Sequence, residues 1–210
     1  MTRLLILLFA LFLGACATTP SPPKLFSEPP SQEQARAWQQ HRQQVNQITS
    51  WTLTGRIVVN TEDDGWNGEL HWSQRTNSYG IQFSAPFGQG AFQLDGSATG
   101  AEIQFSDGKT FQAIDAETLL VEQLGWRLPL NRFRYWVTGI PKPESTSVLK
   151  YRLDGHLDKL QQGQWLVTYP EYVSIDGVMM PRKVFLENHE LSVRLVIDRW
   201  VLNRTTEEEV

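Results

Sequence analysis

From Trp51 onward the chain alternates apolar and polar residues with a period of two, in short segments joined by turn residues. In the first segment, Trp51, Ile57 and Val59 fall on one face. Every second side chain of a strand points to the same side of a sheet. Asp107-Gly108, a strong hairpin signal, separates two such segments. The pattern as far as residue 113 predicts six short strands in an antiparallel meander with one apolar face.

Three segments have helical features instead. Residues 31–48 contain good helix formers without Gly or Pro, and Ser31–Gln34 has a capping-box pattern. Asp115 is a candidate N-cap for a helix that Gly125 ends, and residues 130–137 predict a second short helix. The helices have thin apolar stripes, so we expect them to pack on the sheet.

Strand-like segments then resume, with turns expected at Asp154-Gly155 and Asp176-Gly177. The segments are 149–153, 157–161, 164–169, 172–175, 181–187 and 190–201. We count these segments as about five strands, which gives about eleven strands in the whole chain. A large antiparallel sheet with one apolar face curls into a barrel or half-barrel. The helices could cover its open side.

Cys16 is the only cysteine, and it follows an apolar run from Leu4 to Leu13. Basic Arg3 precedes the run and the small residues Gly14-Ala15 end it, an order typical of a lipoprotein signal. Such a signal is cleaved before the cysteine, which is then acylated. Two or three acyl chains anchor a protein firmly, since each buried methylene contributes about 0.8 kcal/mol. The alternatives are an ordinary secretory signal or a short anchor, although a bilayer span takes about 20 residues.

These features divide the chain into four predicted parts. Residues 1–15 form the signal peptide, and residues 16–30 contain the lipidated cysteine and a proline-rich tether. Residues 31–204 form the globular domain, and residues 205–210 form an acidic tail.

Charge excludes one class of partner. The chain has a formal net charge of −4, and loss of Arg3 with the signal makes it −5. A mildly acidic protein lacks the basic surface that nucleic acid requires. It also has no polybasic patch for anionic lipid, so acyl chains must supply the membrane anchor.

The sequence contains no pattern typical of an enzyme or a metal site. The four histidines, His41, His71, His156 and His189, lie on separate predicted elements without zinc-site spacing. No Gly-x-Ser-x-Gly elbow is present, and Gly88-Gln89-Gly90 lacks the third glycine of a nucleotide-binding loop. We therefore expect no catalytic residue, metal or cofactor.

Two short segments have two interpretations each. Phe87 lies between Pro86 and Gly88 in a loop, where we expect it to point outward toward a partner or membrane; alternatively it folds under the barrel rim.

Another segment combines guanidinium groups with aromatic rings. We favour stacking at a helix–sheet contact over a polar cavity mouth for these residues: Arg127, Arg132 and Arg134 beside Trp126, Tyr135 and Trp136.

Several motifs occur in an order and spacing that together are specific. They are Cys16 with its tether, Trp38-Gln39-Gln40-His41, Thr54-Gly55-Arg56, Ala85-Pro86-Phe87-Gly88, Ile114-Asp115-Ala116-Glu117 and Pro129 to Pro141. In this the chain resembles the LolB family, outer-membrane lipoproteins that accept other lipoproteins and place them in the membrane. The resemblance covers nearly the whole mature chain.

The resemblance implies an unclosed antiparallel β-barrel with a helical lid and an apolar cavity. The cavity would take the acyl chains of a lipoprotein handed over by the periplasmic carrier LolA. The loop Pro86, Phe87 and Gly88 would take part in insertion; the family tip is leucine, and phenylalanine keeps the apolar bulk. Ala17 is not the aspartate that retains lipoproteins at the inner membrane, which implies a lipid anchor in the outer membrane, facing the periplasm.

The resemblance also implies that the inward-facing residues of the predicted strands line the cavity. These are Ile57, Val59, Leu70, Trp72, Ile81, Phe83, Phe92, Leu94, Ile103 and Phe105, with Leu195 and Ile197 closing the far side. The alternative for each is a filled core. The implied partners are LolA, lipoprotein acyl chains and outer-membrane phospholipid, for a monomer without enzymatic activity. The rival functions are a non-transferring structural or assembly lipoprotein that docks through the Phe87 loop, and a lipid-modifying enzyme, for which no acid–base pair is visible.

Overall fold

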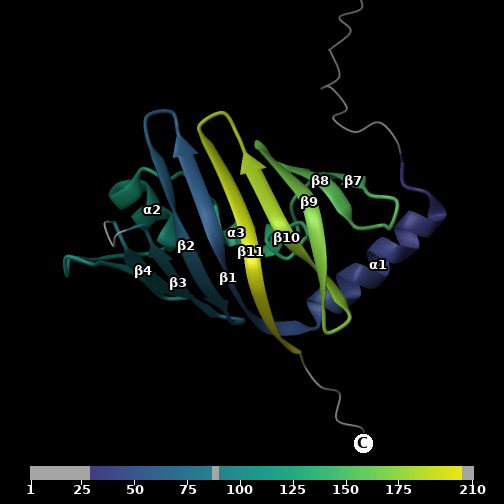
Figure 1. The fold of residues 1–210 in the computed structure, drawn as a ribbon, viewed down its shortest axis with the longest axis horizontal. Helices are drawn as coiled ribbons and strands as arrows, with labels where there is room; N and C mark the ends of the chain where they lie inside the picture. Colours follow the sequence, from purple (N-terminus) through teal and green to yellow (C-terminus); the bar gives the residue numbers. More distant parts are fainter. Residues whose placement is uncertain (1–28, 87–89, 205–210) are drawn as a thin grey trace, which may run out of the picture.

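The computed structural model describes residues 29–86 and 90–204. Within them, eleven strands form one antiparallel sheet in the order β6-β5-β4-β3-β2-β1-β11-β10-β9-β8-β7 (Figure 1). Because β6 and β7 lie at opposite ends of this order, the barrel is unclosed, as predicted. The strands are β1 (Ile48–Thr61), β2 (Gly65–Gln74), β3 (Ser78–Ser84), β4 (Phe92–Ser97), β5 (Gly100–Phe105), β6 (Thr110–Ala113), β7 (Ser147–Tyr151), β8 (Leu157–Gln162), β9 (Trp165–Ile175), β10 (Val178–Glu187) and β11 (Leu191–Arg204).

The three predicted helices are present: α1 (Gln32–Asn46), α2 (Ala116–Leu124) and α3 (Leu130–Trp136). However, α1 ends two residues and α3 one residue before the predicted ends at 48 and 137. Ser31 Oγ accepts from the Gln34 backbone N–H at 3.1 Å, and the Gln34 side chain accepts from the Ser31 N–H at 2.9 Å. Asp115 caps α2, and Gly125 ends it in the left-handed conformation at φ 72°. The capping box and the glycine stop are therefore both confirmed.

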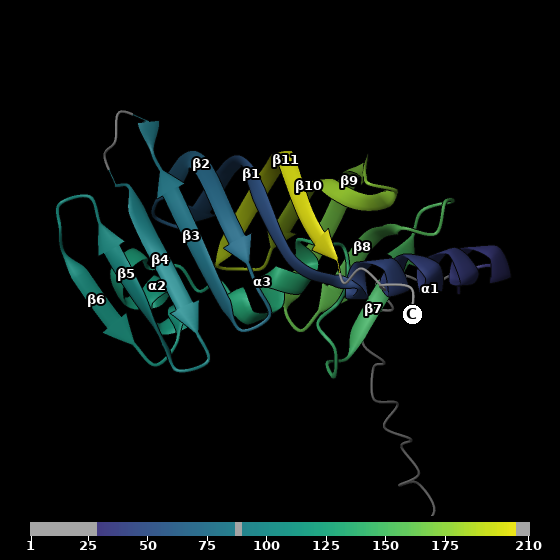
Figure 2. The same cartoon turned by 90° about the horizontal axis from the view of Figure 1, so that it is seen from below.

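The helices α2 and α3 lie on the concave side of the curved sheet, as Figure 2 shows. Helix α2 contacts β4, β5 and β6. Helix α3 crosses the middle of the concavity, since Phe133 contacts Trp72 of β2 and Trp136 contacts Trp165 of β9. Helix α1 packs at the other side of the molecule, against β1 and β10.

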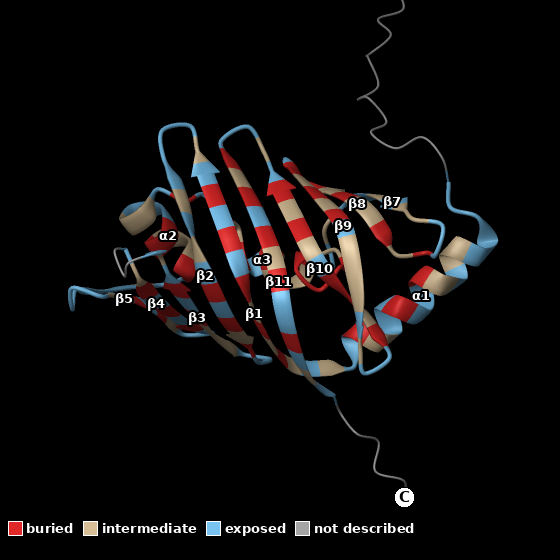
Figure 3. Ribbon diagram, viewed as in Figure 1, coloured by how far each residue is buried: buried red, intermediate tan, exposed pale blue. Residues whose placement is uncertain are grey.

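Burial alternates along the strands, which confirms the period-two reading (Figure 3). One strand differs from the prediction, because β9 runs unbroken over the two expected segments 164–169 and 172–175. Pro170 lacks an N–H but is exposed there, beside a register shift between β9 and β10. Proline is tolerated at such irregularities, so it does not divide the strand.

Helix α1 is held by a small set of contacts. Trp38, His41 and Val45 form its buried face. Gln34 Nε2 also donates to the Arg152 carbonyl at 2.9 Å, so the start of the helix is tied to the β7–β8 turn. The buried histidine lies among other aromatic rings: its centroid is 4.8 Å from that of His156 and 5.8 Å from that of Trp38.

His41 is 2% exposed, and neither ring nitrogen has a hydrogen-bond partner among the described residues. The pKa of His41 is lowered from 6.5 to about 4, mainly by burial and also by the nearby His156, while Asp154 acts in the opposite direction. His41 is therefore neutral near pH 7, and the docking of α1 depends on that neutral form.

We expect the free energy of unfolding to fall as pH drops from 6.5 to about 4. In this window the unfolded chain protonates His41 and the folded chain does not, so acid favours unfolding, by about 3 kcal/mol at the lower end. Urea unfolding at several pH values checks this by comparing wild type with His41→Phe, which should lack this part of the pH dependence. His71→Phe, at an exposed position, is the control. Equal pH slopes in wild type and His41→Phe would contradict the prediction.

Candidate functional site

The twelve predicted lining residues share the concave side of the sheet. Eleven are buried and Phe105 is half-buried. The strand register aligns them in rows across neighbouring strands, for example Leu70 opposite Phe83 and Phe83 opposite Phe92. The prediction that Leu195 and Ile197 close the far side is wrong, because β11 pairs directly with β1: Leu195 lies opposite Ile57 in the middle of the sheet. The structure thus brings the predicted residues together as one apolar surface.

Aromatic side chains from the helical segment cover this surface. Trp126, between α2 and α3, has its ring centroid 6.2 Å from that of Phe83 and 6.0 Å from that of Phe92. Phe133 of α3 packs on Trp72 at 5.3 Å. In the form described by the structure, the predicted lining is in contact with its lid.

The sequence prediction missed the interior surface of β8, β9 and β10. Leu160, Val167, Met180 and Val184 are fully buried there, as is Leu157. Their strands show the same alternation that identified the first half, and this signal could have found them. Trp126 and Phe133 carry no period-two signal because they lie in the helical segment, so only the folded chain places them over the sheet.

Polar atoms without partners lie within this interior. Trp72 Nε1 and Trp126 Nε1 have no hydrogen-bond partner among the described residues, and neither do Gln74 Oε1 and Arg134 Nε. Other buried indoles are satisfied: Trp136 Nε1 donates to Gln162 at 2.8 Å. An unpaired buried donor or acceptor costs about 1–3 kcal/mol, so four of them are unusual in an apolar interior.

Two cavities adjoin Gln74 and Arg134. One, of about 350 Å³, lies between the end of α1, the start of β1 and α3, and has Val45, Ile48 and Trp51 in its wall. The other, of about 230 Å³, lies beside the start of α2. Burial raises the pKa of Tyr79, which lines the second cavity, to about 12, with smaller contributions from Glu117 and Asp115. Its hydroxyl is therefore protonated at neutral pH.

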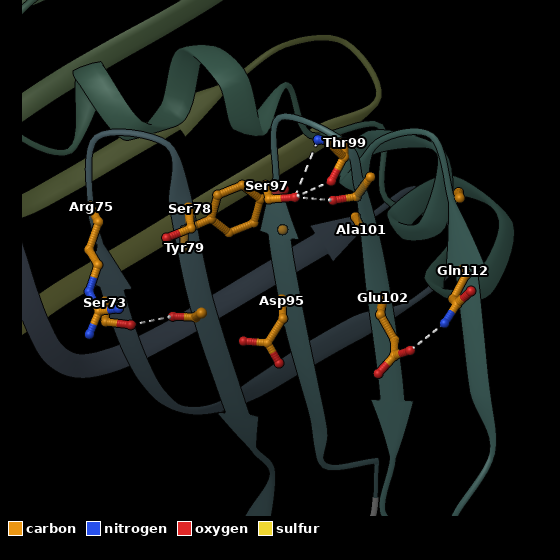
Figure 4. Close-up of a pocket in the computed structure, with 14 residues that line it drawn as sticks. Ser73, Arg75, Ser78, Tyr79, Asp95, Ser97, Thr99, Ala101, Glu102 and Gln112 are labelled. Carbon is orange, nitrogen blue, oxygen red and sulfur yellow. Dashed lines mark hydrogen bonds between the residues drawn. The ribbon is translucent and has the colours of Figure 1, made fainter.

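A third cavity, of about 530 Å³, is polar. It extends over β2 to β6 and is shown in Figure 4. Asp95 and Glu102 border it, and Glu102 accepts a hydrogen bond from Gln112 at 2.6 Å. Carboxylates in the wall make this cavity unsuitable for hydrocarbon, because desolvating them is costly.

The predicted insertion loop is only partly described. Pro86 is exposed, whereas Phe87 and Gly88 lie outside the described residues. Pro86 borders a groove of about 720 Å³ whose wall includes Val58, Phe185 and Val196. Cys16 also lies outside the described residues, so its lipidation stays a prediction.

The three arginines of the predicted stacking cluster go to different partners. Arg134 lies 4.8 Å from the Tyr135 ring centroid and donates to the Tyr135 hydroxyl at 2.9 Å. Arg127 pairs with Glu190 at 3.6 Å. Arg132 extends toward Gly163 in the β8–β9 turn. Stacking is thus observed for one arginine, on tyrosine.

Within residues 29–86 and 90–204, no helix has the length and hydropathy that a membrane crossing requires. In the same part of the chain, no group of three or more His, Cys, Asp or Glu side chains is arranged to hold a metal ion.

An open antiparallel half-barrel with an apolar, helix-covered concave side defines the structural class of this protein. Solved structures share that fold. A LolA superfamily protein from Nitrosomonas europaea aligns with a TM-score of 0.50 at 9% identity, covering 79% of this chain and 93% of the other. A putative outer membrane lipoprotein-sorting protein domain from Vibrio parahaemolyticus aligns with a TM-score of 0.52 at 10% identity, covering 82% and 93%.

The chain belongs to the family described as outer membrane lipoprotein LolB, whose model matches residues 49–200. The outer-membrane lipoprotein LolB of Nitrosococcus oceani is 35% identical over 200 residues, which is 94% of this chain and 96% of the relative. The protein of the same name from Pseudomonas aeruginosa is 36% identical over 169 residues, covering 80% and 82%. The predicted family is therefore confirmed.

Proposed function

We propose that this protein receives lipoproteins from the periplasmic carrier LolA, binds their acyl chains on its concave apolar side and inserts them into the inner leaflet of the outer membrane. The observation that carries the proposal is the continuous apolar surface on the concave side of the sheet in a member of the LolB family. We propose further that the protein is a monomer, anchored through lipidated Cys16 and facing the periplasm.

The physical reason for such a site is the cost of exposing hydrocarbon to water. Each exposed methylene costs about 0.8 kcal/mol, so unassisted passage of two or three acyl chains through the periplasm would be prohibitively slow. Passing the chains from one apolar cavity to another keeps them out of water. The direction of transfer then follows from the difference in affinity between the carrier, this protein and the bilayer.

Binding requires the aromatic lid to move. Trp126 and Phe133 contact Phe83 and Trp72, so entering acyl chains replace these contacts with their own. Because one apolar contact replaces another, the exchange has a small net cost, and the interior stays shielded from water in both forms.

A transfer assay tests the proposal. The carrier is loaded with a labelled lipoprotein and mixed with this protein, and the label is followed after the two are separated. We expect the label to move to this protein without added energy. A label that stays on the carrier, while a LolB protein from Pseudomonas aeruginosa takes it up in parallel, would refute the proposed function.

A further inference from the structure

Two residues that have polar atoms without partners, Gln74 and Arg134, line the same two cavities. Trp72 and Gln74 are two residues apart on β2 and share its inner face, as their burial at 1% and 7% exposure shows. Arg134 follows Phe133, whose ring packs on Trp72 at 5.3 Å. Gln74 Oε1 of β2 and Arg134 Nε of α3 are thus the unpartnered atoms of residues that border both cavities, whereas Trp72 borders neither.

Other polar atoms of Gln74 and Arg134 already have partners. Gln74 Nε2 donates to the carbonyls of Arg75 and Ser78, at 2.7 and 3.4 Å. An Arg134 Nη2 hydrogen bond goes to the Tyr135 hydroxyl. The unpartnered atoms of the two residues are therefore one donor, Arg134 Nε, and one acceptor, Gln74 Oε1.

One of the two cavities that Gln74 and Arg134 line has apolar residues in its wall. Gln74 and Arg134 line the cavity of about 350 Å³, whose wall includes Trp51 and Ile140. The Trp51 ring lies 5.0 Å from that of Trp72, so the cavity wall continues into the predicted acyl-chain lining. A molecule that combines hydrocarbon with a few hydrogen-bonding atoms fits this place.

We infer that Gln74 and Arg134 bind the amide that joins an acyl chain to the lipid-modified end of a cargo protein. An N-acyl amide offers one carbonyl acceptor to the guanidinium Nε of Arg134, and one N–H donor to Gln74 Oε1. A bare hydrocarbon chain satisfies neither of these atoms. A carboxylate satisfies the Arg134 donor and leaves Gln74 Oε1 unpaired. The inference rests on the proposed function and adds to it a recognition of the acyl linkage.

The test uses the full acylated protein in non-ionic detergent micelles with photo-reactive probes. One probe is an N-dodecanoylglycinamide, the second is a dodecyl ether of the same length, and the third is dodecanoate. Partition into micelles is the same for every variant, so differences between variants report on the protein. Labelling is quantified against probe concentration, and the labelled peptides are identified by mass spectrometry.

We expect wild type to prefer the amide over the ether by about tenfold, and over dodecanoate by a smaller factor. Arg134→Met and Gln74→Met should each reduce the preference for amide over ether to about twofold. Circular dichroism shows whether the variants fold. Arg132→Met, on the same helix but directed toward Gly163, should keep the full preference.

Equal labelling by amide and ether in wild type would overturn the inference and leave the proposed function standing, since acyl chains still bind. An unreduced preference in both Arg134→Met and Gln74→Met would also overturn it, as would dodecanoate binding that equals amide binding. Absence of labelling by all three probes would instead refute the proposed acyl-chain binding itself.

Discussion

A Phe87→Glu variant is expected to accept lipoprotein from the carrier and to fail to deliver it to liposomes. Placing a carboxylate in the hydrocarbon region costs about 3 kcal/mol, which lowers the population of an inserted loop by about a hundredfold. Acceptance depends on the concave side of the sheet and should be unchanged. The two steps are measured separately, the first by loss of label from the carrier and the second by its appearance in floated liposomes.

The matched control is Phe87→Leu, which keeps an apolar side chain and should deliver at close to the wild-type rate. If Phe87→Glu delivers as well as Phe87→Leu, the loop has no role in insertion. If it fails at acceptance, the loop acts in the exchange with the carrier.

A Gly55→Ala substitution is expected to destabilise the fold by about 2–4 kcal/mol. Gly55 lies on β1 at a register shift against β11. A Cβ there would overlap the Val196 carbonyl oxygen and come within 2.9 Å of the Ile197 Cα. Both obstacles are backbone atoms of the paired strand, so the clash is relieved only by separating β1 from β11, at the centre of the sheet.

Urea unfolding followed by tryptophan fluorescence measures this effect. Gly65→Ala is the control, because the nearest atom to its added Cβ is the Asn60 side-chain oxygen, at 3.1 Å, which can move. We expect a change of less than about 1 kcal/mol for the control. Equal stabilities of the two variants would show that the β1–β11 pairing adapts to a side chain.

Most of the fold followed from local sequence features. Alternation places Ile57, Leu70 and Phe92 on the interior face, and caps such as Ser31 and Gly125 define the helix ends. These signals depend on a few neighbouring residues, so one sequence is enough to read them. The error at Pro170 has a different origin, since a strand tolerates proline only where its neighbour changes register, and register belongs to the pairing of two strands.

The residues that the sheet contributes to the site were predictable from the sequence, and those that the helical segment contributes were not. The sheet supplies residues through alternation, and alternation continues from Trp72 to Gln74, so Gln74 could have been placed inside. Trp126, Phe133 and Arg134 come from a segment of about a dozen residues that crosses the concavity. The curvature of the whole sheet determines which sheet residues this segment contacts. No local sequence pattern predicts these contacts.

The open order of the strands determines which motion the protein can make at low cost. In a closed barrel, widening the interior breaks a ladder of backbone hydrogen bonds. Here β6 and β7 are the free ends of one ribbon, so the two wings can spread while every described strand pairing remains intact. Only side-chain contacts with the helices change. Under the proposed function, the interior would therefore expand in proportion to the hydrocarbon bound, and a single sheet would serve cargo with different numbers of acyl chains.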